Sequence, residues 1–192
     1  LNNYMLNNKI PEELYNEVKN LNEQAYKYVH DIWSEADKLD GPEAEDLKEE
    51  ASIIQNSFFR RLFDQLEESK KELILNYTKT DTDFVDEFNG WFNKDLIIIP
   101  KFDDDIINAL DLTIDYTKNK WFLPWLKEQD HNHSYLAKHQ IEWIIEDSHN
   151  YYQESLKELE NNQIEKSDLD VISDDVNLVK NFFGKTIKEV KE

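Results

Sequence analysis

The chain has 192 residues, of which 42 are acidic and 22 are basic, so its formal net charge at pH 7 is −20. A field of that sign repels nucleic-acid phosphates and anionic lipid headgroups, which disfavours direct binding of DNA, RNA or a membrane surface. It favours cations, basic peptides and basic proteins as partners. The chain contains no cysteine, which excludes disulfides, thiolate metal sites and cysteine nucleophiles.

The composition favours an all-α fold. Only 3 glycines and 4 prolines are present, too few for the turns of a large sheet, and long segments are rich in helix-forming residues. Apolar periodicity predicts an irregular antiparallel helical bundle of about five to seven helices. The length is that of one domain, so residues 1–192 are expected to form a single unit, with the polar segment 161–175 as a linker before a C-terminal helix.

Two long helices open the chain. Pro11 precedes an apolar stripe and predicts a helix over 11–38, which Gly41-Pro42 ends. A second helix is predicted over 43–75, and the pair should form an antiparallel hairpin. The aromatic segment 84–92 then predicts a short helix that is capped by the polar residues before it.

The second half of the chain alternates short and long elements. Residues 96–100 are apolar and predict an extended, buried connection, and Asp103 to Asp105 mark the start of a helix. The polar stretch 130–134 predicts a loop, from which a long helix runs to about Asn161. Ser173 is the expected cap of a last helix that reaches the C-terminus.

The sequence leaves the cellular compartment open. Its longest apolar runs, Leu96 to Pro100 and Trp121 to Leu126, are far shorter than the roughly 20 residues that span a bilayer, so no transmembrane segment is expected. The cytoplasm is slightly favoured. An exported or surface protein is also compatible, because the chain begins at Leu1 instead of a methionine and a leader or an earlier domain would then precede it.

Acidic residues crowd the junction of the first two predicted helices. Helix starts favour carboxylates, but this cluster holds more acid than capping requires and should repel itself. A basic protein partner would relieve that repulsion, which makes the cluster the main candidate for partner binding. Its members are Asp37, Asp40, Glu43, Glu45, Asp46, Glu49 and Glu50.

Three tryptophans form a second candidate surface. Trp121 and Trp125 flank Pro124, and aromatic residues near a helix break more often belong to a core than to an interface. Trp143 lies opposite the apolar stripe of its own helix on a helical wheel, so either a second layer of the protein or a partner must cover it.

Glu and His residues give an alternative, catalytic interpretation. Glu146 and His149 have the Glu-x-x-His spacing of a bundle metal site, Glu142 precedes them by one turn, and Glu23 and His30 share a face of the first helix. A helical wheel places all five outside the apolar stripes, whereas a bundle site needs inward ligands. No cofactor is therefore expected.

The residues favour a binding role over catalysis. The sequence has no glycine-flanked serine elbow and no phosphate-binding loop. The preferred hypothesis is a non-catalytic module whose acidic faces engage a basic protein, as an inhibitor, an immunity-type protein or a nucleic-acid mimic would. One alternative is a helical-bundle metalloenzyme that uses the carboxylate and histidine residues. Another is a surface or exported interaction domain that uses the aromatic patch. The sequence does not fix the oligomeric state.

Overall fold

The computed structural model describes residues 8–191 except 102, 116–117, 119 and 129–132, and it leaves out the side chains of residue 128 and residues 186–191. Backbone contacts divide the chain into two compact units, Leu1–Leu96 and Ile97–Glu192, whereas its length predicts a single domain. Each unit is described by itself. The all-α prediction is confirmed: eight helices and one small sheet occur in the described ranges.

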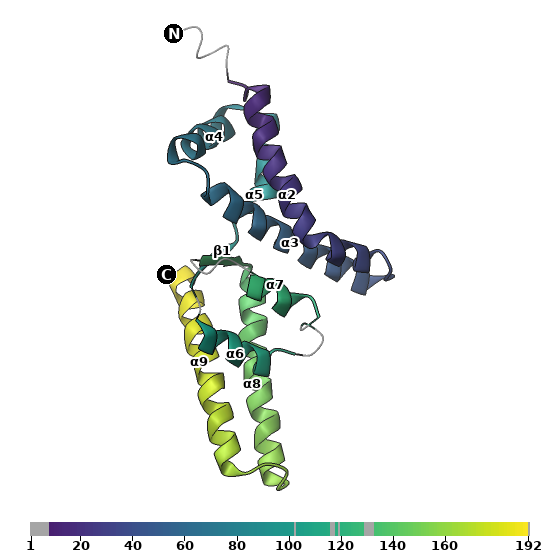
Figure 1. Cartoon of the computed structure of the whole chain (residues 1–192), viewed down its shortest axis with the longest axis vertical. Coiled ribbons are helices and arrows are strands. Elements are labelled where there is room, and N and C mark those ends of the chain that lie inside the picture. Colours follow the sequence, from purple (N-terminus) through teal and green to yellow (C-terminus); the bar gives the residue numbers. More distant parts are fainter. Residues whose placement is uncertain (1–7, 102, 116–117, 119, 129–132, 192) are drawn as a thin grey trace. The chain divides into compact units, whose positions relative to one another are not determined.

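Over its described residues 8–96, the regular elements of the first unit are all helices. Its elements are α2 (Glu12–Ala36), α3 (Pro42–Asp64), α4 (Glu68–Thr80) and α5 (Thr82–Phe92). The helices α2 and α3 fold back on each other through residues 37–41, as the hairpin prediction requires (Figure 1). Small buried residues allow this close pairing, since Ala25 and Ala36 on α2 and Ala51 on α3 are all completely inaccessible to solvent.

The prediction of one helix over 43–75 is wrong, because this range contains parts of two helices, α3 and α4. The first, α3, ends at Asp64, and α4 begins at Glu68. The connection contains neither glycine nor proline, so the sequence shows no breaker there. The break is stabilised by a tertiary contact instead: the Nζ atom of Lys71 donates a 3.3 Å hydrogen bond to the carbonyl of Asp64.

Aromatic packing fills the core between α3 and α5. Phe59 and Phe63 of α3 contact Phe88 of α5, with ring centroids 6.0 and 5.7 Å apart. The end of α5 depends on the buried amide of Asn56, whose Nδ2 atom donates to the carbonyls of Gly90 and Trp91 at 2.7 and 3.0 Å. These two carbonyls lie in the last turn of α5, so a side chain from α3 satisfies acceptors that the helix itself leaves open.

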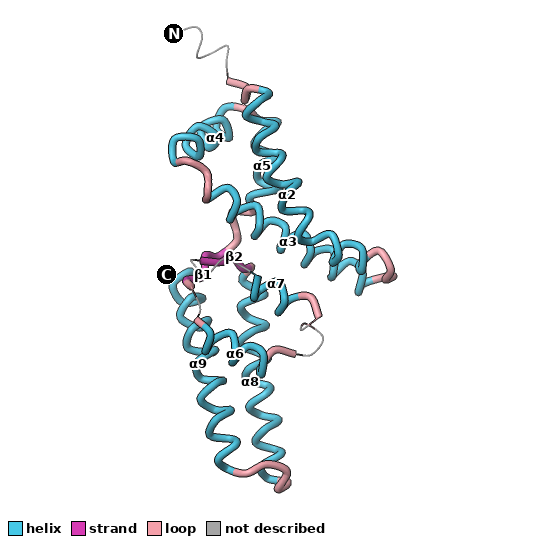
Figure 2. Tube along the Cα trace, viewed as in Figure 1, coloured by secondary structure: helices cyan, strands magenta, loops and turns pink. Residues whose placement is uncertain are grey.

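In the part of the second unit that the structure describes, there are four helices and a two-stranded sheet. Its elements are β1 (Ile97–Pro100), α6 (Asp104–Thr113), α7 (Phe122–Glu128), β2 (His133–Leu136), α8 (Lys138–Glu160) and α9 (Lys166–Lys191). The extended segment predicted over 96–100 is confirmed as β1. It pairs antiparallel with β2, and Ile97 lies opposite Leu136 (Figure 2). The predicted loop over 130–134 is therefore a strand from His133 onward, and residues 130–132 lie outside the described residues.

The helices α8 and α9 form the long hairpin of this unit. The left-handed backbone of Asn162, with φ of 59°, follows the end of α8. Only residues 161–165 separate the two helices, because α9 begins at Lys166 and not at Ser173. The carboxylate of Asp168 accepts a 3.0 Å hydrogen bond from the backbone N–H of Glu165 and so closes the first turn of α9. Most of the segment predicted as a linker is thus helical.

None of the helices in the described part of the chain is long and apolar enough to cross a membrane.

Candidate binding surfaces

The acidic cluster of the sequence lies at the connection between α2 and α3, and we call it the acidic tip. It consists of Asp37, Asp40, Glu43, Glu45, Asp46, Glu49 and Glu50. Asp37 follows the last residue of α2, and Gly41 turns the chain with a positive φ of 73° before α3 begins at Pro42. Every carboxylate of the tip is exposed except that of Glu50, whose residue is only 6% exposed. Glu50 therefore does not belong to the accessible surface.

Little positive charge offsets the acidic tip. The ion pair described within it joins the Nζ atom of Lys48 to Glu45 at 4.0 Å, across one turn of α3. Glu43 and Glu45 lie in the first turn of α3, where the positive end of the helix dipole stabilises them. Asp37 lies instead at the negative end of α2, and the last turn of α2 carries no basic residue. The tip thus combines exposed carboxylates with a helix C-terminus beside which Lys38 supplies one exposed positive charge.

Two of the three tryptophans, Trp121 and Trp143, contact each other within the second unit, and Trp125 contacts Phe122 with ring centroids 5.3 Å apart. The Trp143 ring on α8 lies 6.4 Å from the Trp121 ring and 6.3 Å from the Phe122 ring, and the Lys118 ammonium lies 4.9 Å from the Trp143 ring centre. Trp125 is only 4% exposed. Trp121 and Phe122, at the start of α7, thus cover part of the Trp143 ring. A second layer of the protein therefore packs on Trp143, which the helical wheel placed opposite the apolar stripe of its helix.

The residues of the metal alternative do not converge. Glu23 and His30 lie on α2 in the first unit, and their side chains are exposed. Glu142, Glu146 and His149 lie on α8 in the second unit and are exposed as well, as the helical wheel predicted. Among the residues that the structure describes, no group of three or more His, Asp or Glu side chains is arranged to hold a metal ion.

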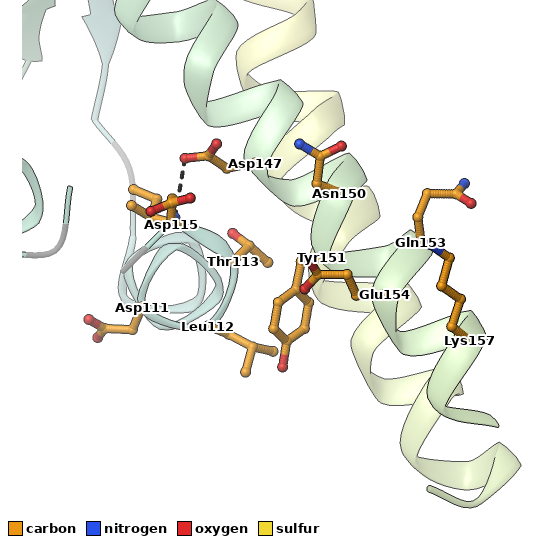
Figure 3. A pocket seen from close by; sticks show the side chains of 11 residues that line it. Asp111, Leu112, Thr113, Asp115, Asp147, Asn150, Tyr151, Gln153, Glu154 and Lys157 are labelled. Carbon is orange, nitrogen blue, oxygen red and sulfur yellow. Dashed lines mark hydrogen bonds between the residues drawn. The ribbon is translucent and has the colours of Figure 1, made fainter. Parts of the chain in front are cut away.

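A groove that the sequence did not reveal runs between the end of α6 and the middle of α8 (Figure 3). Its volume is about 580 Å³. Most of its lining is polar, and only Leu112, Ile114 and Tyr151 contribute apolar surface. The four lining carboxylates belong to Asp111, Asp115, Asp147 and Glu154, against one lysine, Lys157.

Internal hydrogen bonds fix two of these carboxylates. Asp147 on α8 accepts hydrogen bonds from the Lys118 ammonium at 3.0 Å and from the Asp115 backbone N–H at 3.2 Å. Asp111 forms a 2.7 Å ion pair with Lys127 of α7. Sequence periodicity could not find this groove, since it exists only because the C-terminal end of α6 packs beside α8.

Asp81 is a buried carboxylate of the first unit that two backbone N–H groups hold in place. Its Oδ1 atom accepts from the Phe84 N–H at 3.1 Å and caps α5, while its Oδ2 atom accepts from the Ile10 N–H at 2.9 Å. Burial acts to raise the pKa of Asp81, but the two backbone donors and the charge of Lys9 outweigh burial and lower that pKa below its usual value. The side chain therefore joins the segment before α2 to the α4–α5 junction.

Comparison with known proteins gives no further guide: no family model matches the chain, and neither curated proteins nor solved structures provide a significant match.

Proposed function

We propose that this protein is a non-catalytic module that binds a basic protein partner through the acidic tip. The observation that carries the proposal is the exposure of all the tip carboxylates except Glu50 around a single described ion pair, that of Glu45 with Lys48 at 4.0 Å. Like charges held this close raise the free energy of the unbound protein, and a basic surface would lower it. An inhibitor, an immunity-type protein or a nucleic-acid mimic would all use such a surface.

The arrangement of the helix ends also supports this proposal. Asp37 adds negative charge at the C-terminus of α2, where a helix favours a cation. A lysine or arginine of a partner that approached the tip would therefore interact with the carboxylates and with the negative end of the helix dipole. The alternatives receive less support, because the metal ligands do not converge among the described residues, Trp121 contacts Trp143 and Trp125 is buried.

The test compares two variants of equal charge. Glu45→Lys with Glu49→Lys reverses charge within the tip, and Glu72→Lys with Asp86→Lys makes the same change at exposed sites elsewhere in the first unit. The probe is a fluorescent, lysine-rich peptide that carries a photo-crosslinker, and stopped-flow fluorescence measures its association at several salt concentrations. Circular dichroism checks that the helicity of both variants is unchanged.

We expect the tip variant to slow association by about tenfold at low salt and to weaken the salt dependence, because exposed charges act over roughly 8–10 Å at physiological ionic strength. Crosslinks should concentrate on residues 37–49. The proposal fails if the control variant slows association equally or if crosslinks spread over the whole surface, since the acid would then be a solubilising coat. Binding that is independent of salt would also refute it.

A further inference from the structure

The groove between α6 and α8 offers two kinds of contact to a long cationic side chain. Leu112 of α6, which is 38% exposed, and the half-buried ring of Tyr151 on α8 supply apolar surface. Glu154, one turn below Tyr151 on α8, places a carboxylate beside that surface (Figure 3). The groove volume of about 580 Å³ falls within the range of about 300–1,000 Å³ that is usual for ligand sites.

The groove is electrically negative for two independent reasons. Four carboxylates line it against the single lining lysine, Lys157, and the exposed carboxylate of Glu154 lies beside Tyr151, whose pKa it raises. In addition, α6 ends at Thr113 beside the groove, and its last turn carries no basic residue, so its C-terminal carbonyls add negative potential.

The surroundings of the groove also shift the pKa of the Tyr151 phenol. Burial raises its pKa, and the carboxylates of Glu158, Asp175 and Glu154 raise it further. The ring of Tyr151 is therefore partly desolvated and surrounded by acid, which is the environment in which a cation binds most favourably to an aromatic face.

We propose that this groove receives an arginine side chain of the basic partner, an inference that rests on the proposed function and adds a second contact site within the second unit. Arginine fits better than lysine for two reasons. Its planar guanidinium stacks on an aromatic ring such as Tyr151, and its forked donors bind a carboxylate such as Glu154 while its stem packs on Leu112.

The experiment uses small probes, so that it does not depend on knowing the partner. N-acetyl-arginine amide is titrated into the ¹⁵N-labelled full chain, and amide chemical shifts locate the binding. The matched probes are N-acetyl-citrulline amide, which has the same shape without charge, and N-acetyl-lysine amide. The variants are Glu154→Gln and Tyr151→Leu, with Glu142→Gln as a control on an exposed part of α8 where Glu142 pairs with Lys138.

We expect the arginine probe to give saturable shifts at 111–115 and 147–157. Glu154→Gln should weaken binding by about three- to fivefold, Tyr151→Leu by a similar factor, and Glu142→Gln should leave it unchanged. The citrulline probe should give no saturable shift, and the lysine probe should bind more weakly. Spectral dispersion verifies that each variant is folded.

Three results would overturn the inference: equal binding of citrulline, equal binding of lysine, or shifts spread over every acidic surface. The failure of the proposed function looks different. If the variant with Glu45→Lys and Glu49→Lys binds the lysine-rich peptide normally while groove shifts persist, the role of the tip is refuted and the arginine site remains. If that variant slows the peptide but the groove stays silent, only the groove is refuted.

Discussion

Asp81 should be essential for the stability of the first unit, and two substitutions separate its two contacts. Asp81→Asn keeps an oxygen for the Phe84 N–H but places an amide donor against the Ile10 N–H. Leaving that buried donor unsatisfied should lower the free energy of unfolding by about 1–3 kcal/mol. Asp81→Ala also removes the helix cap, which typically adds about 1 kcal/mol.

The pH dependence of this loss follows from the direction of the pKa shift. The pKa of Asp81 is lower in the folded chain than the usual value of an aspartate, so the unfolded state binds the proton more readily. The stability that the carboxylate contributes is then fully present well above the unfolded pKa of about 4 and is lost as pH falls through the folded pKa. The difference between wild type and Asp81→Ala should therefore be constant from pH 7 to about pH 5 and should shrink below about pH 4.

Urea unfolding with pulsed hydrogen–deuterium exchange of peptides from residues 8–92 measures this difference in the first unit alone. Asp83→Asn is the matched control, because the Asp83 side chain is 90% exposed although it also pairs with Lys9, at 3.3 Å. That control should have little effect, as is usual for an exposed ion pair. A loss for Asp83→Asn as large as that for Asp81→Asn would refute the reasoning, as would an Asp81→Ala effect that stays the same down to pH 2.

Two further predictions concern buried contacts. Asn56→Ala should lower the free energy of unfolding of the first unit by about 1–3 kcal/mol, because the carbonyls of Gly90 and Trp91 lose their donor, and faster amide exchange confined to the end of α5 would verify it. Trp143→Ala should lower the thermal stability of the second unit, since its ring packs on that of Trp121, and the loss should be about 2–3 kcal/mol because Trp143 is only half-buried. Unchanged melting of Trp143→Ala, with loss of peptide binding alone, would contradict this and favour an aromatic binding patch.

Local signals in the sequence predicted much of the helical structure. Asp81, one of the polar residues before the aromatic segment 84–92, caps α5 as predicted. Asp103 caps α6 and accepts a 3.1 Å hydrogen bond from the Ile106 N–H. Such signals succeed because a helix start depends on one side chain and on donors within three residues of it. The apolar stripe predicted for the first helix likewise forms the buried face of α2, which includes the fully buried Val18 and Val29.

Contacts outside the apolar pattern explain where the sequence prediction failed. The Lys71 ammonium bonds the Asp64 carbonyl at the break between α3 and α4, and the pairing of β2 with β1 appears only after these segments pack. The early start of α9 is a different case, because the Asp168 carboxylate accepts a local bond from the Glu165 N–H, three residues away. That local signal was present in the sequence, but the polarity of the segment favoured a loop.

The candidate sites likewise include residues whose exposure the sequence pattern predicted and features that depend on how the helices pack. Helical periodicity anticipated that Glu146 and His149 face outward, because exposure on a helix follows from the apolar stripe. It did not separate Glu50, which is buried, from the rest of the acidic tip. The groove beside Tyr151 was missed entirely, because its walls come from α6 and α8, and a single sequence does not show that these two helices pack together.

The position of some acidic residues at helix C-termini is the feature that supports the proposed binding role over a purely solubilising one. A coat of charge that serves only solubility has no reason to favour the C-terminal ends of helices, where a carboxylate typically costs about 0.3–1 kcal/mol. Yet Asp37 follows the end of α2, and Asp111 and Asp115 lie around the end of α6. The last turns of both helices carry no basic residue. A cationic side chain bound there would neutralise a carboxylate and a helix dipole together. We expect such binding to gain most at the end of α2, because Asp111 at the end of α6 already pairs with Lys127 at 2.7 Å.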